Sequence, residues 1–96
     1  MGNNFRYATP THSVVSAGTS SKVALAANTD RRYALFVNDS DTNLYLALST
    51  GAAANTGIRL NANGGNYEIN ATNMYYGVVN VFSTTASKNL LVTEGE

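Results

Sequence analysis

The sequence predicts an all-β protein: an antiparallel β-sandwich or small β-barrel of about seven or eight short strands, with an extended N-terminal arm. Short apolar segments recur at intervals of about 8 to 12 residues, and clusters of Gly, Asn, Asp, Ser and Thr separate them. No segment of useful length shows the apolar period of an amphipathic helix. At 96 residues, the chain is long enough to bury one modest core.

Residues 1–21 are the least apolar part of the chain and are predicted to be an extended arm or an edge strand. Pro10 cannot donate a hydrogen bond to a central ladder, which restricts this stretch to the edge of a sheet. Residues 17–21 (AGTSS) indicate a flexible joint. An arm of this length could lie across a neighbouring subunit, and a frayed terminus is the alternative. The β-sandwich domain is expected to span residues 22–96.

The most apolar stretch, residues 32–48, predicts a central β-hairpin. Residues 32–37 are almost continuously apolar, which is typical of a strand buried on both faces. Residues 43–48 place three Leu side chains on one face. The intervening residues 38–42 (NDSDT) favour a tight turn, because their short polar side chains bond the nearby backbone. Before this hairpin, residues 22–27 predict a half-buried strand that turns Val23 and Leu25 to the same side.

Four further strands are predicted in the second half of the chain, at residues 58–60, 67–69, 74–82 and 90–93. Asn63-Gly64, between the first two, is a hairpin signal because both residues tolerate positive φ. Gly77 inside the third indicates a bulge or a close approach of the backbone.

The composition argues against several classes of function. Six basic and six acidic residues give zero net charge, so the basic patch of a nucleic-acid-binding protein is absent. No apolar run has the length of a membrane helix, and the N-terminus lacks the pattern of a secretory signal. Only 12% of residues are charged, so the surface consists largely of Asn, Thr, Ser, Gly and Ala. Such a surface suits contact with proteins or sugars, and a plain neutral β-domain is the alternative.

Few residues offer catalytic or metal-binding chemistry, so we expect no enzyme, no cofactor and no metal. Cysteine is absent, and His12, the single histidine, has no nucleophile motif around it and is expected on the surface. Asp39 and Asp41 could together bind calcium, but an Asx-rich turn explains them without an ion. Arg31-Arg32 is interpreted as a solvated pair at the start of a strand rather than as a phosphate clamp.

Four segments together resemble small structural proteins of tailed bacteriophages: residues 25–32 (LAANTDRR), 36–48 (FVNDSDTNLYLAL), 58–69 (IRLNANGGNYEI) and 76–81 (YGVVNV). The resemblance covers about residues 22–96. It implies a β-rich, non-enzymatic, multimeric protein of the virion, made in the host cytoplasm. The expected function is capsid decoration or cementing, with the major capsid protein and further copies of this chain as partners. The alternative is a neck, tail or fibre component, such as a glycan-binding module that uses exposed Tyr and Asn side chains.

Two groups of residues are the candidates for contact with other proteins. The N-terminal arm would lie on a neighbouring subunit, and aromatic residues, which are enriched at protein interfaces, would carry self-association. The proposed interface residues are Asn3, Phe5, Tyr7, Val14, Val15, Tyr75 and Tyr76.

Overall fold

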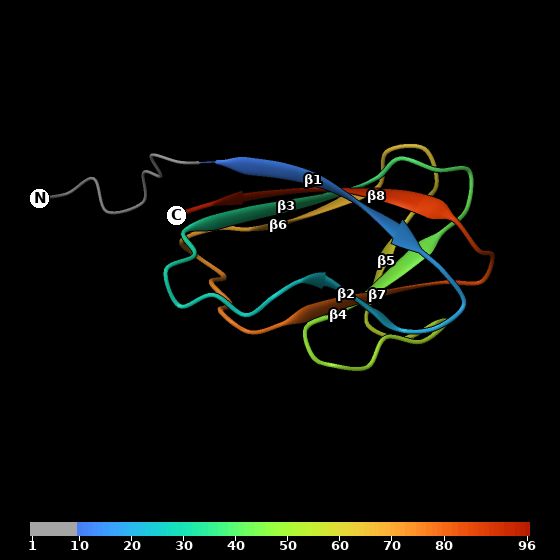
Figure 1. The fold of residues 1–96 in the computed structure, drawn as a ribbon, viewed down its shortest axis with the longest axis horizontal. Coiled ribbons are helices and arrows are strands. Elements are labelled where there is room, and N and C mark those ends of the chain that lie inside the picture. Colours follow the sequence, from blue (N-terminus) through green and yellow to red (C-terminus); the bar gives the residue numbers. More distant parts are fainter. Residues whose placement is uncertain (1–9) are drawn as a thin grey trace, which may run out of the picture.

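The computed structural model describes residues 10–96 and confirms the all-β prediction. Eight antiparallel strands in this part of the chain form two four-stranded sheets, which lie as two layers in Figure 1. Sheet A has the order β1-β8-β3-β6, and sheet B has the order β2-β7-β4-β5. The strands are β1 Thr11–Ala17, β2 Lys22–Leu25, β3 Tyr33–Asn38, β4 Leu44–Ala47, β5 Ile58–Leu60, β6 Asn66–Ile69, β7 Val79–Ser83 and β8 Lys88–Gly95.

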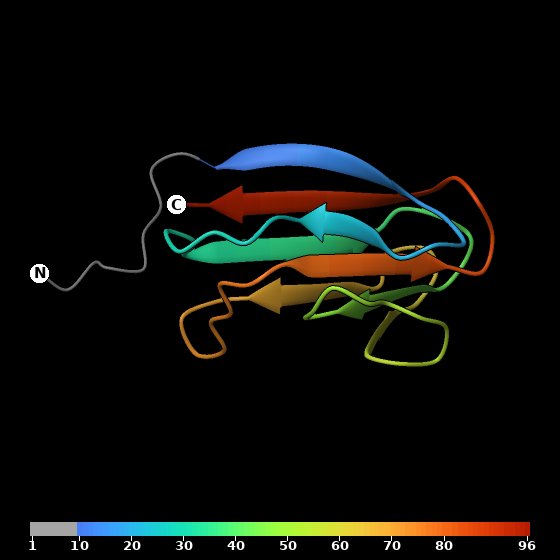
Figure 2. The ribbon, with the colours of Figure 1, turned by 60° about the horizontal axis from the view of Figure 1, so that its bottom comes forward.

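The core lies between the two sheets and is built from the inward-facing residues of alternating strand positions. In both layers the longer strands lie along nearly the same axis (Figure 2), as in an aligned β-sandwich. In β3 the inward side chains are buried and the intervening ones are half-buried. The prediction that this strand is buried on both faces is therefore wrong. The largest apolar side chains of the core are Phe36, Leu44, Leu46, Leu60, Ile69, Val79, Val81, Leu90 and Val92.

The predicted hairpin between residues 32–37 and 43–48 is wrong, although both segments are strands. β3 lies in the middle of sheet A between β8 and β6, whereas β4 lies in the middle of sheet B between β7 and β5. The turn between them therefore crosses from one layer to the other. β3 and β4 pair instead with strands that come later in the chain, and those pairings bury more apolar surface than a two-stranded hairpin could.

The hairpin predicted at Asn63-Gly64 is wrong for the same reason, since β5 belongs to sheet B and β6 to sheet A. Both residues do have positive φ, 62° and 114°. This turn lies beside the β3–β4 turn, and the Asn63 amide donates to the Ser40 carbonyl at 2.7 Å. Gly64 donates to the Asn38 carbonyl at 2.8 Å, so the two crossing turns brace each other.

Asn38, at the end of β3, holds these crossing turns from inside the fold. Its side-chain amide is fully buried and donates to the carbonyls of Thr42 and Leu60, at 2.8 and 2.9 Å. Its side-chain oxygen accepts from the Ser40 hydroxyl at 2.6 Å. With these bonds the buried Asn38 side chain has its own polar atoms paired and links the β3–β4 turn to the end of β5.

Two other strands differ from the sequence-based expectation. In β2, a register shift between Val23 and Leu25 turns Ala24 into the core and leaves Val23 51% exposed, so the expected inward face is wrong for Val23. The strand predicted at residues 74–82 begins only at Val79, and Gly77 lies in the loop before it. The sequence predicts an arm or an edge strand for residues 1–21. Within this segment, Thr11–Ala17 is an edge strand of sheet A.

Candidate functional site

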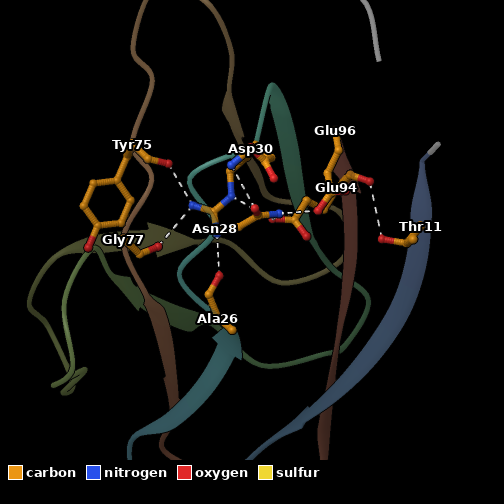
Figure 3. A network of polar contacts seen from close by, with 9 residues as sticks. Thr11, Ala26, Asn28, Asp30, Tyr75, Gly77, Glu94 and Glu96 are labelled. Atoms are coloured by element: carbon orange, nitrogen blue, oxygen red, sulfur yellow. Dashed lines mark hydrogen bonds and ion pairs between the residues drawn. The ribbon is translucent and has the colours of Figure 1, made fainter. Parts of the chain in front are cut away.

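One end of the sandwich is held together by Arg31, whose side chain is buried in a network of polar contacts (Figure 3). Its Nε donates to Glu94 Oε2 at 2.8 Å, and its Nη2 donates to the Ala26 carbonyl at 2.6 Å. Its Nη1 donates to the carbonyls of Tyr75 and Gly77, at 2.7 and 3.1 Å. The interpretation of Arg31 as a solvated residue is wrong. A buried guanidinium already bonded to a carboxylate and three carbonyls acts as a structural link between segments.

Asn28 extends this network to the C-terminal strand. Its side-chain amide donates to Oε2 of Glu94 at 3.2 Å and to Oε2 of Glu96 at 2.7 Å. Its backbone amide donates to the Tyr76 carbonyl at 2.8 Å. The loop before β3, the loop before β7 and the end of β8 are therefore fixed to one another, which positions the two candidate tyrosines.

Tyr75 and Tyr76 are neighbours in the chain but differ in exposure. The Tyr75 hydroxyl donates to the Val78 carbonyl at 2.9 Å, and its ring packs against the core and over Gly77, where a Cβ atom would collide with it. The sequence predicts a bulge or a close approach of the backbone at Gly77, whereas the atoms that approach it here belong to the Tyr75 side chain. Tyr76 is 49% exposed and borders a hollow that Asp30, Met74 and Glu96 also line. Tyr76 is the one of the pair that presents its side chain to solvent.

Val14 and Val15 lie on opposite faces of β1. Val15 packs against the core, whereas Val14 is 60% exposed on the outer face of sheet A. Val14 pairs with Leu91 of β8, which is 37% exposed, and Leu91 pairs with Val37 of β3. Directly paired residues share a face, so these three side chains form an apolar row across β1, β8 and β3. We call Val14, Leu91 and Val37 the outer apolar row.

The surroundings of the outer apolar row are polar and mostly uncharged. His12 pairs with Thr93 beside it, and the His12 ring nitrogen Nδ1 lies 2.9 Å from the Thr93 hydroxyl oxygen. Asn66 pairs with Val37 at the far side of the row. An apolar strip bordered by neutral polar side chains can be covered by a protein partner at little desolvation cost.

The remaining candidate residues do not assemble into a reactive cluster. Within residues 10–96, no group of three or more His, Cys, Asp or Glu residues is arranged to hold a metal ion. Asp41 is exposed and pairs with Lys88 Nζ at 2.8 Å. Hydrogen bonds from Lys88 and Thr42, with the charge of Lys88, hold the pKa of Asp41 below its usual value. Asp41 therefore forms an ion pair at the surface of the β3–β4 turn.

A second hollow lies on the outer face of sheet B, lined by Asn55, Thr56, Gly57, Arg59, Asn61 and Tyr45. Tyr45 is 7% exposed, and its hydroxyl donates to Asn55 Oδ1 at 3.2 Å. Sugar rings stack on the open face of an aromatic side chain, and the ring of Tyr45 is covered. The hollow therefore offers amide and guanidinium groups to a ligand but no stacking surface.

The sequence-based candidates Asn3, Phe5 and Tyr7 lie outside the described residues. Leu91 and Val37 were not among the candidates, although the pattern of β8, with Leu90 and Val92 on the opposite side from Leu91, indicates that one Leu of the pair must face outward. Among the residues that the structure describes, no helix is long and apolar enough to span a membrane. Comparison of the chain with protein-family models, with curated proteins and with solved structures gave no match.

Proposed function

We propose that this chain is a non-enzymatic structural protein of a bacteriophage virion, which decorates or cements the capsid by bridging subunits of the shell. Two arguments support the proposal. The segments between residues 25 and 81 resemble small phage structural proteins, and the outer face of sheet A offers the kind of neutral, partly apolar surface that protein partners cover. The outer apolar row is the observation that carries it, since Val14 is 60% and Leu91 37% exposed.

The physical advantage of such a protein is multivalency. Each contact between a small β-domain and a capsid subunit is weak, because the available apolar strip is narrow. When one protein, or an oligomer of it, touches two or more subunits, the second contact forms at a high effective concentration. Ligands that bind only the assembled shell also stabilise it by mass action. Under this proposal, the partners are the major capsid protein and further copies of the chain, and the site of action is the capsid surface.

The first experiment is quantitative mass spectrometry of purified particles of the phage that encodes the chain. A copy number that is a simple fraction of the major capsid protein, running to hundreds per particle, supports capsid decoration. A few to a few tens of copies would replace capsid decoration with a neck, tail or fibre position, where glycan binding becomes the function to test. Absence from the particle would overturn the structural role.

The second experiment tests the surface itself. Capsid shells that lack the protein are incubated with recombinant wild-type chain, with Leu91→Asn and with the matched control Val23→Asn, which alters an exposed apolar residue on sheet B. Weakened binding of Leu91→Asn alone supports the outer apolar row as the capsid-binding face. Equal binding by all three proteins removes this face from the proposal.

A further inference from the structure

The outer edge of β1 has no neighbouring strand in the part of the chain that the structure describes, because sheet A begins with β1. The hydrogen bonds between β8 and β3 show which backbone groups of β1 point to this edge. The Asp39 amide donates to the Asn89 carbonyl at 3.0 Å, so the polar backbone groups of Asn89 face β3. Asn89 is the partner of Ser16, whose own backbone groups must therefore face away from β8. In agreement, the Ser16 carbonyl accepts a hydrogen bond from Lys22 Nζ at 3.1 Å.

The orientation alternates along a strand, so His12, Val14 and Ser16 all direct their backbone N–H and C=O groups to the open edge. The paired set Thr11, Ser13, Val15 and Ala17 faces β8. Pro10, the residue before β1, has no N–H and cannot extend the row of donors. The open edge therefore consists of three residues with a common spacing, and Val14 is the middle one.

Natural proteins protect sheet edges with short strands, bulges or charged side chains, and β1 has few of these devices. Its seven residues keep one continuous register with β8 and include no Lys, Arg, Asp or Glu. By contrast, the edge strands β2 and β5 of sheet B have four and three residues, and β2 has a register shift. β6, at the other edge of sheet A, has four residues and includes Glu68. Of the described edges, β1 is the one built to accept another strand.

We propose that this edge binds the same edge of a second copy, so that two β1 strands pair antiparallel about a two-fold axis at Val14. In this register Val14 faces Val14 of the second copy, and His12 faces Ser16 in both directions. All three outward residues are then used, giving about six intermolecular hydrogen bonds. Two four-stranded sheets become one continuous eight-stranded sheet. A shift of the register would place one of the three residues opposite Pro10 or opposite a residue that follows β1. The Val14-centred pairing therefore gives the largest number of outward N–H and C=O groups a partner.

A second copy is favoured over an unrelated strand because the edge complements itself. The outer apolar row starts at Val14, so the dimer doubles it into one strip that crosses six strands: β3, β8 and β1 of each copy. The two Val14 side chains, 60% exposed in the monomer, cover each other across the axis. β1 contains no Lys, Arg, Asp or Glu, and His12 faces Ser16 of the second copy, so no two like charges lie opposite each other. Lys22 must leave the Ser16 carbonyl, and its flexible side chain makes that displacement cheap.

This inference does not rest on the capsid proposal, because the dimer is expected in buffer with no other component present. Edge-strand pairing buries a small interface, so we expect a dissociation constant of about 10 to 100 µM. Sedimentation velocity over protein concentrations that bracket this range should show a monomer that converts to a dimer. A chain that remains monomeric up to about 1 mM would overturn the proposal.

Two variants locate the contact. Val14→Pro removes an N–H that faces the open edge but no hydrogen bond of the β1–β8 ladder, so it should abolish the dimer and leave the thermal midpoint nearly unchanged. Ser13→Pro, its matched control, removes an N–H that β8 uses and should lower the thermal midpoint. A Val14→Pro protein that folds and still dimerises would rule out the β1 edge.

The register is tested by disulfide formation, since the chain has no cysteine of its own. Paired residues on the two-fold axis have Cα atoms about 5.5 Å apart, which a disulfide can span. Under mild oxidation, Val14→Cys should therefore form a covalent dimer at least about tenfold faster than Val23→Cys, whose side chain is similarly exposed on sheet B. Equal rates for the two variants would contradict the Val14-centred pairing.

Discussion

Arg31 and Glu94 form a largely buried ion pair that ties the loop before β3 to the end of β8. Arg31 Nε lies 2.8 Å from Glu94 Oε2, the Arg31 side chain is fully buried and that of Glu94 is 15% exposed. The charge of Arg31 is further distributed over the carbonyls of Ala26, Tyr75 and Gly77. Burial of a charged pair stabilises a fold only when the remaining donors and acceptors are also satisfied, as they are around this guanidinium.

Replacing Arg31 with methionine should therefore destabilise the protein strongly. The variant leaves the Glu94 carboxylate with only the neutral Asn28 amide as a donor and removes the Arg31 donors from three carbonyls. The loss of one partner of a buried pair typically costs about 3 to 5 kcal/mol. Urea unfolding followed by circular dichroism measures the change. Arg59→Met, at an exposed position of β5, is the control and should change stability by less than about 0.5 kcal/mol. Similar unfolding midpoints for the two variants would show that the network contributes little.

Asn38→Ala should destabilise the fold through the crossing turns. The variant removes the Asn38 donor from the Leu60 carbonyl and one of two donors from the Thr42 carbonyl, which keeps its bond from the Ser40 hydroxyl. Two weakened acceptors next to the core cost about 2 to 3 kcal/mol. Amide hydrogen exchange should also speed up at Gly64, whose amide donates to the Asn38 carbonyl, and at residue 38, whose amide donates to the Gly65 carbonyl. Asn66→Ala, at an exposed Asn whose side-chain amide donates to the nearby Gly64 carbonyl, is the comparison. Unchanged exchange in Asn38→Ala would contradict the bracing role of this side chain.

Two glycines in loops should respond differently to alanine. A Cβ atom at Gly65 would collide with the backbone of Asn61 and Leu60, whereas a Cβ at Gly51 would meet nothing within 4 Å. Gly65→Ala should therefore lower stability by about 2 kcal/mol or more, because backbone atoms cannot move aside cheaply. Gly51→Ala should be neutral or slightly stabilising, since it restricts the unfolded chain. Thermal unfolding of both variants tests this contrast, and equal midpoints would argue against the close packing of the β5–β6 turn.

Lys88 should control the titration of Asp41. Hydrogen bonds from Lys88 and from Thr42 lower the pKa of Asp41 below 3.8 in the folded protein. A lowered pKa means that this contact stabilises the folded state at pH values above about 4, and that the contribution is lost as the pH falls through the folded-state pKa. In Lys88→Met, the pKa of Asp41 measured by NMR should rise toward 3.8. Lys22→Met serves as the control, because Lys22 bonds the Ser16 carbonyl. The same Asp41 pKa in wild type and Lys88→Met would disprove the coupling.

The sequence predicted the candidate interaction surface only in part. The place of Val14 in the N-terminal segment makes it an interface candidate, and the structure places it on an exposed sheet face. Its companions Leu91 and Val37 come from strands that are 77 and 23 residues further along the chain, and only the pairing of β1, β8 and β3 puts them in one row. Exposure of an apolar residue depends on which face of the sheet is turned toward the core. In a Leu-Leu-Val segment, either the middle Leu or its two neighbours can face the core.

Arg31 shows the opposite error. An Arg pair after Asp30 is usually solvated, and nothing in the adjacent residues indicates a buried guanidinium. Apart from the Ala26 carbonyl, its hydrogen-bond acceptors belong to Tyr75, Gly77 and Glu94, all more than 40 residues away. Burial of a charge depends on partners gathered by the whole fold, so a local pattern could not reveal it.

The sequence by itself determined that the protein is all-β, where most of the strands lie and which residues occupy positive φ in the Asn63-Gly64 turn. These features depend on local physical chemistry: alternation of apolar side chains, the backbone freedom of Gly and Asn, and the turn-forming side chains of Asn, Asp and Ser. Only the tertiary structure decided that consecutive strands cross between sheets everywhere except at β4 and β5, that β3 and β4 each lie at a sheet centre, and that β1 is left as an open edge. Strand partners are selected by burial of apolar surface summed over both layers, and a five-residue turn is compatible with either a hairpin or a crossing.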